Sequence, residues 1–122
     1  MITILVIDDD SEYRQMIEEM LKSAGYGILG AGDGEEGLLL YREKRPDLII
    51  TDLIMPCKEG IGLIMEIKNE FPEAKIIAIS GGGRSGPDTM LRAAKVLGAQ
   101  FTIKKPFERA KLLGKVEECL TT

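Results

Sequence analysis

Short apolar runs alternate along the chain with segments of helical periodicity. Four of these runs are rich in β-branched residues and almost uninterrupted, which is typical of strands that a parallel sheet buries on both faces. The four predicted strands cover residues 2–7, 48–53, 75–80 and 100–104. A fifth, weaker strand is predicted over residues 26–31, where glycines dilute the apolar run.

Between the strands, apolar residues recur at the i, i+3 and i+4 spacing of amphipathic helices. Helices are predicted over residues 11–24, from 33 or 34 to 43, and over 61–71, 90–97 and 107–120. We expect the last helix to bury Phe107, Ala110, Leu113, Val116 and Leu120. The alternation of strand and helix predicts one α/β domain over residues 1–122, with a doubly wound parallel sheet between two layers of helices.

Charged and polar residues follow the predicted strands at the edge where such a sheet binds ligands. They are Asp8, Asp9, Asp10, Asp52, Ser80, Lys104 and Lys105. One aspartate explains a helix cap, but three do not. Clustered carboxylates raise each other's pKa unless a cation lies among them, and Mg²⁺ held by carboxylates and a phosphate suits this pattern.

Asp52 ends an otherwise apolar strand, where a carboxylate is either a paired structural charge or a functional group. Beside Mg²⁺ and a lysine it has the chemistry of a nucleophile for phosphoryl transfer, because carboxylates form aspartyl phosphates. The Lys105 ammonium and the Ser80 hydroxyl then supply a positive charge and a donor to the phosphoryl oxygens.

The composition excludes several other classes of protein. The formal net charge of −4 argues against binding nucleic acid through a basic face. Without histidine, the chain cannot form a Ser-His-Asp triad or a histidine-ligated zinc site, and any phosphoryl donor is another molecule. Cys57 and Cys119 form no CxxC pair. Since no apolar run approaches the roughly 20 residues of a membrane span, we expect a cytoplasmic protein without membrane contact.

Four motifs, in this order, resemble the receiver domain of bacterial response regulators. They are ILVIDDD at 4–10, DLIITDLIMP at 47–56 with Gly60 after it, IIAIS at 76–80 and KPF at 105–107. AGDGEEGL at 31–38 and LGA at 97–99 add to the resemblance, which spans nearly the whole chain. It implies a flavodoxin-like fold with strand order 2-1-3-4-5, five helices and a Lys105–Pro106 bond that is often cis.

The resemblance also implies a role in two-component signal transduction. Asp52 is then the phosphoacceptor, and Ser80 and Lys105 contact the phosphoryl group. The implied ligands of Mg²⁺, for which Mn²⁺ can substitute, are Asp9, Asp52, the backbone carbonyl of Ile54 and, through water, Asp8. The implied phosphoryl donor is a sensor histidine kinase or a histidine phosphotransfer protein. The domain is then no enzyme, although it assists its own phosphorylation and dephosphorylation, and is a monomer or a weak phosphorylation-dependent dimer that acts on a downstream protein.

The residues that would transmit phosphorylation depart from the family pattern. Where most receivers have an aromatic residue, three places before the matching lysine, this chain has Thr102, with Phe101 one place earlier. The GGGRSG segment at 81–86 makes the stretch after Ser80 about three residues longer than in chemotaxis-type regulators. We expect the switch to use Gly81, Gly82 and Gly83 more than an aromatic rotamer, and to act on the face formed by helix 4, strand 5 and helix 5.

Three alternatives compete with this interpretation. Residues 32–37 and 81–86 both match the GxGxxG pattern of dinucleotide-binding proteins, but Asp33, Glu35 and Glu36 would repel a pyrophosphate at the first of them. A degenerate receiver that serves only for interaction would not need the complete acidic site. A haloacid-type phosphatase shares the aspartyl-phosphate chemistry, but its nucleophile normally follows the first strand.

Overall fold

A computed structural model describes residues 1–53, 60–81 and 87–121, and in these ranges strands and helices alternate. The strands are β1 (Thr3–Ile7), β2 (Gly27–Ala31), β3 (Leu48–Asp52), β4 (Ile76–Ser80) and β5 (Phe101–Lys104). The helices are α1 (Ser11–Ser23), α2 (Gly34–Lys44), α3 (Gly60–Glu70), α4 (Pro87–Leu97) and α5 (Arg109–Leu120). The predicted strands and helices, including the weak second strand, are therefore confirmed.

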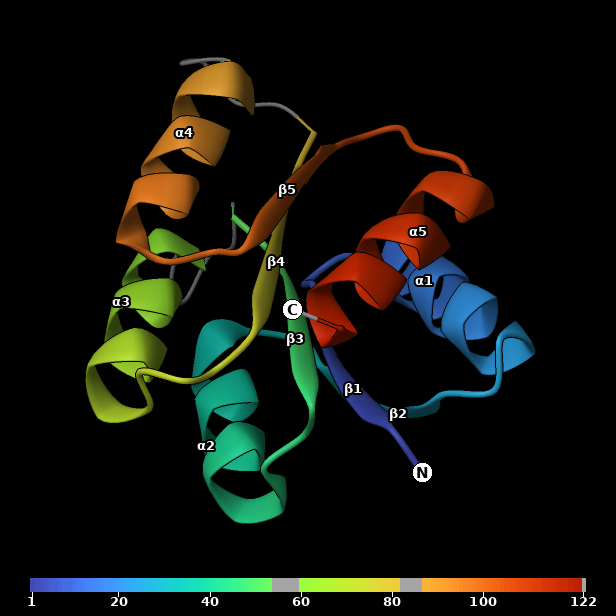
Figure 1. Cartoon of the computed structure of the whole chain (residues 1–122), viewed down its shortest axis with the longest axis horizontal. Helices are drawn as coiled ribbons and strands as arrows, with labels where there is room; N and C mark the ends of the chain where they lie inside the picture. Colours follow the sequence, from blue (N-terminus) through green and yellow to red (C-terminus); the bar gives the residue numbers. More distant parts are fainter. Residues whose placement is uncertain (54–59, 82–86, 122) are drawn as a thin grey trace.

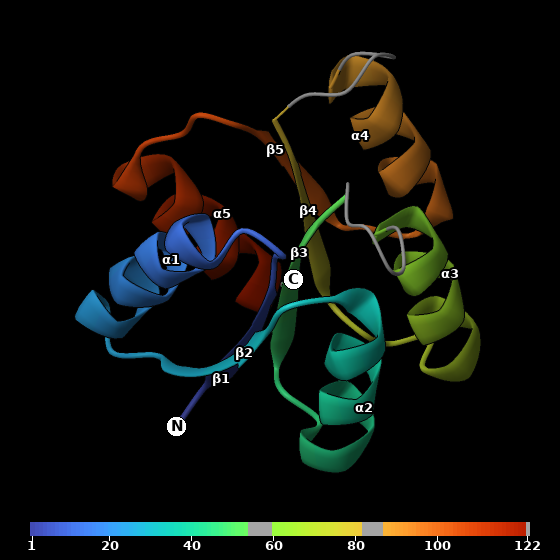
Figure 2. The ribbon, with the colours of Figure 1, turned by 180° about the vertical axis from the view of Figure 1, so that it is seen from behind.

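The five strands form one parallel sheet in the order β2-β1-β3-β4-β5. Helices α1 and α5 cover one face of the sheet, and α2, α3 and α4 cover the other (Figures 1 and 2). This is the doubly wound, flavodoxin-like architecture that the sequence predicts. The order of the strands reverses beside β1, so that β1 and β3 lie next to each other at the switch point.

Each strand contributes to two hydrophobic cores because its successive side chains point to opposite faces. In β1, Leu5 and Ile7 belong to the core beneath α2, α3 and α4, whereas Ile4 and Val6 belong to the core beneath α1 and α5. All four side chains are almost completely buried. This explains why the strands appear in the sequence as continuous apolar runs without polar alternation.

The prediction of which residues α5 buries is wrong in part. The helix begins at Arg109, so Phe107 precedes it, and Ala110 is exposed. Its buried residues are Leu112, Val116 and Cys119, while Leu113 and Leu120 pack at the margin of the core. Two overlapping sets of apolar residues in this segment have helical spacing. Packing against the sheet buries the set that the sequence analysis did not predict.

The N-terminus of α2 is capped by the side-chain carboxylates of Asp33 and Glu36. Asp33 is the N-cap and its Oδ1 accepts from the backbone N–H of Glu36 at 2.9 Å, while Glu36 Oε1 accepts from the N–H of Gly32 at 2.8 Å. These bonds occupy two of the N–H donors that a pyrophosphate would use at this turn and place two carboxylates there, which disfavours the dinucleotide-binding alternative. The second GxGxxG match, at 81–86, falls mainly outside the described residues.

None of the helices in the described part of the chain has the length and apolarity that crossing a bilayer requires.

Candidate functional site

The carboxylates of Asp8, Asp9 and Asp52 meet at the carboxyl edge of the sheet. One oxygen from each lies within 4.8 Å of the others. The strand register brings them together, because β1 and β3 pair in parallel with Ile7 beside Thr51, which places the next residues of both strands side by side. Asp8 is buried and Asp52 is 8 % exposed, whereas Asp9 is exposed. The cluster therefore combines two buried carboxylates with one that faces solvent.

Asp10 does not belong to this cluster. It is the N-cap of α1, and its Oδ1 accepts from the backbone N–H groups of Glu12 at 3.0 Å and Tyr13 at 3.2 Å. Of the three successive aspartates, one caps a helix and two belong to the acidic cluster. Helix capping therefore does not account for all three.

Local hydrogen bonds fix the position of Asp8. Its backbone N–H donates to the carbonyl of Ala31 at 3.1 Å, and its Oδ1 accepts from the N–H of Asp10 at 3.0 Å. Arg14, one turn into α1, donates from its guanidinium to the Asp8 carbonyl at 2.7 Å. The sequence alone gave no indication of this role for Arg14. The Asp8 carboxylate consequently enters the site from a backbone whose N–H and carbonyl are both hydrogen-bonded.

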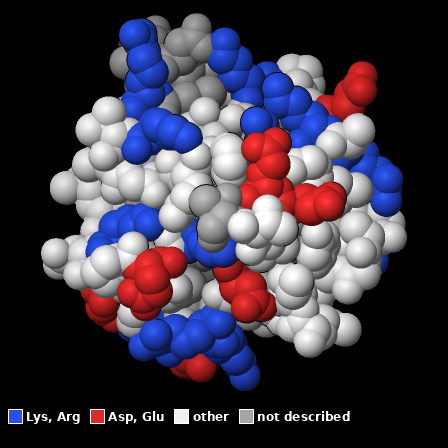
Figure 3. Space-filling view, in the orientation of Figure 1, with Lys and Arg blue, Asp and Glu red and all other residues white. Residues whose placement is uncertain are grey.

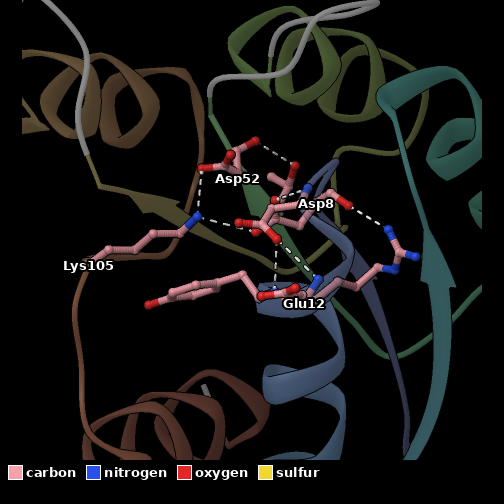
Figure 4. Close-up of polar contacts among 8 residues, drawn as sticks. Asp8, Glu12, Asp52 and Lys105 are labelled. Atoms are coloured by element: carbon pink, nitrogen blue, oxygen red, sulfur yellow. Dashed lines mark hydrogen bonds and ion pairs between the residues drawn. The ribbon is translucent and has the colours of Figure 1, made fainter.

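Lys105 brings a positive charge to the acidic cluster from the end of β5. Its ammonium lies 3.2 Å from Asp8 Oδ2 and 3.6 Å from Asp52 Oδ1. Figure 4 marks both contacts with dashed lines. Its backbone N–H donates to the Ser80 carbonyl at 2.9 Å, which holds residue 105 against the end of β4, and its bond to Pro106 is cis. Lys105, rather than Lys104, therefore contacts the carboxylates.

The pKa of Asp52 is raised to about 6. Burial is the largest cause, because it disfavours the charged form of the carboxyl group. The Lys105 ammonium and a hydrogen bond from the Leu53 backbone lower this pKa, and the nearby charges of Asp8 and Asp9 raise it. The carboxyl group of Asp52 is thus ionised at neutral pH, but with an energetic penalty that further positive charge would relieve.

The donors of the acidic cluster fit a hard divalent cation. Carboxylate oxygens are the side-chain ligands that Mg²⁺ and Ca²⁺ prefer. Three carboxylates face the single ammonium of Lys105, which leaves the cluster with excess negative charge when all are ionised. The expected contribution of the Ile54 carbonyl lies outside the described residues.

Ser80 is the last residue of β4 and is completely buried. Ile79 pairs with Asp52 in the sheet, so Ser80 comes one residue beyond the level of that carboxylate. Its hydroxyl has no hydrogen-bond partner among the described residues. An unsatisfied buried hydroxyl is costly, and at this edge it is a donor that a bound anion could use.

Thr102 and Phe101 lie on opposite faces of β5. Thr102 pairs with Ala78 and Phe101 pairs with Ile77, so the two side chains alternate across the sheet. The Phe101 ring packs with the core beneath α1 and α5. Of the glycines expected to switch, Gly81 is described, while Gly82 and Gly83 lie outside the described residues.

A model of the response regulator receiver domain matches residues 4–117. Protein CcdB of Bacillus subtilis is 38% identical over 121 residues, which are 98% of both chains. Among solved structures, the receiver domain of NtrX from Brucella abortus superposes with a TM-score of 0.91 at 30% identity, covering 98% of both chains. In the CheX–CheY–BeF₃–Mg²⁺ complex from Borrelia burgdorferi, the matching chain gives 0.88 at 28% identity, covering 96% of this chain and 87% of that one.

Proposed function

The chain belongs to the response regulator receiver domain family, and we propose that it acts in two-component signalling by accepting a phosphoryl group on Asp52 in a magnesium-dependent reaction. Receivers of this family are typically phosphoacceptors and not enzymes. The observation that carries the proposal is the convergence of Asp8, Asp9 and Asp52 with the Lys105 ammonium at one edge of the sheet.

Asp52 is the nucleophile in this proposal. Its ionised carboxylate oxygen forms a bond to phosphorus while the bond from phosphorus to the donor's leaving atom breaks, and the electron pair of that bond stays with the donor. The donor in this proposal is a sensor histidine kinase or a histidine phosphotransfer protein, as is typical of the family, and it is another molecule because the chain has no histidine of its own. The pKa of about 6 keeps Asp52 mostly ionised at neutral pH.

Lys105 and Ser80 bind the phosphoryl oxygens. The Lys105 ammonium, which already touches two carboxylates, offsets the negative charge that arrives with the phosphoryl group. The buried Ser80 hydroxyl, which has no partner among the described residues, donates a hydrogen bond to one of its oxygens.

Asp8, Asp9 and Asp52 would hold Mg²⁺, with Asp8 acting through water and Ile54 adding its backbone carbonyl, and Mn²⁺ would substitute. The bound ion would neutralise charge on the phosphoryl oxygens. Support comes from the three carboxylate donors and from the Mg²⁺ in the Borrelia CheX–CheY complex.

The output face in this proposal consists of α4, β5 and α5, and it meets a downstream protein in the cytoplasm. Lys and Arg side chains gather along the segment from β5 to α5 in Figure 3. A groove on this face is lined by Thr102, Lys104, Pro106, Phe107, Glu108 and Lys111. Phosphorylation is proposed to change this face in a monomer or a weak dimer, through the segment that begins at Gly81.

Intact-mass measurement after incubation with phosphoramidate and Mg²⁺ tests the proposal. The wild-type chain should gain the mass of one phosphoryl group, and neither Asp52→Asn nor the wild type in EDTA should gain it. Asp47→Asn is the matched control, because Asp47 immediately precedes β3, at the opposite end of the strand from Asp52. A full mass gain in Asp52→Asn would refute the assignment of the phosphoacceptor.

Phosphate release separates the phosphatase alternative from a receiver. A receiver should keep the phosphoryl group on the protein for a time that the mass spectrum can follow, with about one group per chain. Release of many equivalents of phosphate per minute from p-nitrophenyl phosphate would instead favour a phosphatase.

A further inference from the structure

The aromatic ring of Tyr13 lies against the charged end of Lys105. The Lys105 ammonium is 4.1 Å from the centre of this ring. Ammonium groups are attracted to the face of an aromatic ring within about 6 Å, and the attraction grows when the ion is withdrawn from water. The Lys105 side chain is 17 % exposed, so its charge is largely withdrawn.

Two contacts fix the Tyr13 ring. The backbone N–H of Tyr13 donates to the Asp10 carboxylate at 3.2 Å, which sets the residue in the first turn of α1. The ring also meets Phe107 edge to face, with centroids 5.9 Å apart and an interplanar angle of 73°. Tyr13 therefore joins the start of α1 to the segment between β5 and α5.

The stem of Lys105 is confined on another side by Gly81. A Cβ at position 81 would lie 2.7 Å from Cδ and 2.8 Å from Cβ of Lys105. The methylene groups of Lys105 thus pack against the backbone of Gly81, and its ammonium contacts the Tyr13 ring. A long and flexible side chain is held along its length by groups that carry no charge.

We propose that Tyr13 is a positioning residue that keeps the Lys105 ammonium at the phosphoryl site. This inference rests on the proposed function. A divalent cation among Asp8, Asp9 and Asp52 would weaken the attraction of the carboxylates for Lys105. The tyrosine ring is neutral, so its attraction for the ammonium persists, and it does not compete with phosphoryl oxygens for the charge.

Loss of the ring should slow phosphorylation because the ammonium would spend less time near Asp52. Four rotatable bonds give a lysine side chain considerable conformational entropy, and ordering it has to be balanced by contacts. With the strength that is usual for a partly desolvated cation–π pair, we expect Tyr13→Leu to lower the rate of Asp52 phosphorylation about fivefold.

Comparison of two substitutions tests this role with phosphoramidate as donor and saturating Mg²⁺. Tyr13→Leu should be about fivefold slower than wild type, and Tyr13→Phe, which keeps the ring, should stay within about twofold. Tyr26→Leu is the control for removal of a half-buried tyrosine that packs in the same core. A wild-type rate in Tyr13→Leu, or an equal loss in Tyr13→Phe, would overturn the inference.

A second measurement does not depend on phosphorylation. The ring current of Tyr13 should shift the ε-methylene proton resonances of Lys105 upfield in the NMR spectrum, and the shift should persist when Mg²⁺ is added and vanish in Tyr13→Leu. Loss of the shift on adding Mg²⁺ to the wild type would overturn the inference. Absence of phosphorylation in the wild type would refute the proposed function instead, so the two failures are distinguishable.

Discussion

Gly60 lies against the backbone of Asp52 so closely that a side chain could not be placed between them. A Cβ at position 60 would overlap the Asp52 carbonyl oxygen and lie 2.6 Å from the Cα of Leu53. The Gly60 N–H also donates to the Leu53 carbonyl at 3.0 Å. The start of α3 is thereby packed directly against the strand end that carries the proposed phosphoacceptor.

Gly60→Ala should consequently destabilise the protein, by about 1–3 kcal/mol as is usual for overpacking, and should impair phosphorylation by displacing Asp52. Gly62→Ala is the matched control in the same helix, because its Cβ would meet nothing within 4 Å. Alanine is the better helix former, so the control should gain about 0.5–1 kcal/mol. Urea unfolding measures both changes, and equal stability of the two variants would contradict the packing argument.

Asp52→Asn should stabilise the metal-free protein at neutral pH. The raised pKa means that the folded state binds a proton more tightly than the unfolded chain, so Asp52 lowers the free energy of unfolding as the pH rises from about 4 to about 6. At about 1.4 kcal/mol per pKa unit, the loss reaches at most about 3 kcal/mol. The amide has no such penalty, so the advantage of the variant should be absent below pH 4, grow between pH 4 and pH 6 and be complete above pH 6.

Urea unfolding in EDTA at a series of pH values measures this difference between wild type and variant. Titrating groups away from the acidic cluster contribute nearly equally to both proteins and cancel in the difference. A variant whose stability followed that of the wild type at every pH would show that burial of the Asp52 charge carries no such penalty.

Binding of Mg²⁺ should weaken in acid through the same group. A cation at the cluster requires the ionised form of Asp52, so its apparent affinity should be nearly constant above pH 7 and fall about tenfold per pH unit well below pH 6. Calorimetric titration should therefore give an affinity about tenfold lower at pH 5 than at pH 7. An affinity that is unchanged between these pH values would place the ion away from Asp52.

The three successive aspartates should differ in their effect on Mg²⁺ binding. Asp10→Asn keeps an oxygen that caps α1, so Mg²⁺ affinity should change by about threefold or less. Asp9→Asn replaces a charged ligand of the proposed site by a neutral amide oxygen and should weaken binding by about tenfold or more. The same titration at pH 7 compares the two, and an equal loss in both would contradict the division between cap and cluster.

The sequence predicted the architecture well because the information lies in local patterns. Runs without polar alternation identified strands buried on both faces, and the parallel arrangement then required the residues after β1 and β3 to share an edge. The resemblance to receivers, now confirmed by the family match, selected Lys105 over Lys104, and the structure brings the Lys105 ammonium to the carboxylates.

Tertiary packing decided what the sequence could not. Two stripes of α5 have helical spacing, and packing against the sheet buries the one that the sequence did not favour. Tyr13 lies in the helix that the sequence predicts over residues 11–24, but its contact with Lys105 joins residues 92 positions apart, which helical periodicity does not reveal. The only available signal was its position three residues after the cap Asp10, which directs it toward the edge of the sheet that holds the site.

The acidic cluster has a consequence for how the folded state is maintained. Its carboxylates come from strands more than forty residues apart, so the unfolded chain has no comparable binding site. A divalent cation that binds there selects the folded state, and at a hundred times its dissociation constant it would add about 2.7 kcal/mol of stability. Without the ion, repulsion among the clustered carboxylates lowers the stability of the native fold. A bound cation would relieve this repulsion, so the magnesium concentration would influence how much folded protein is present.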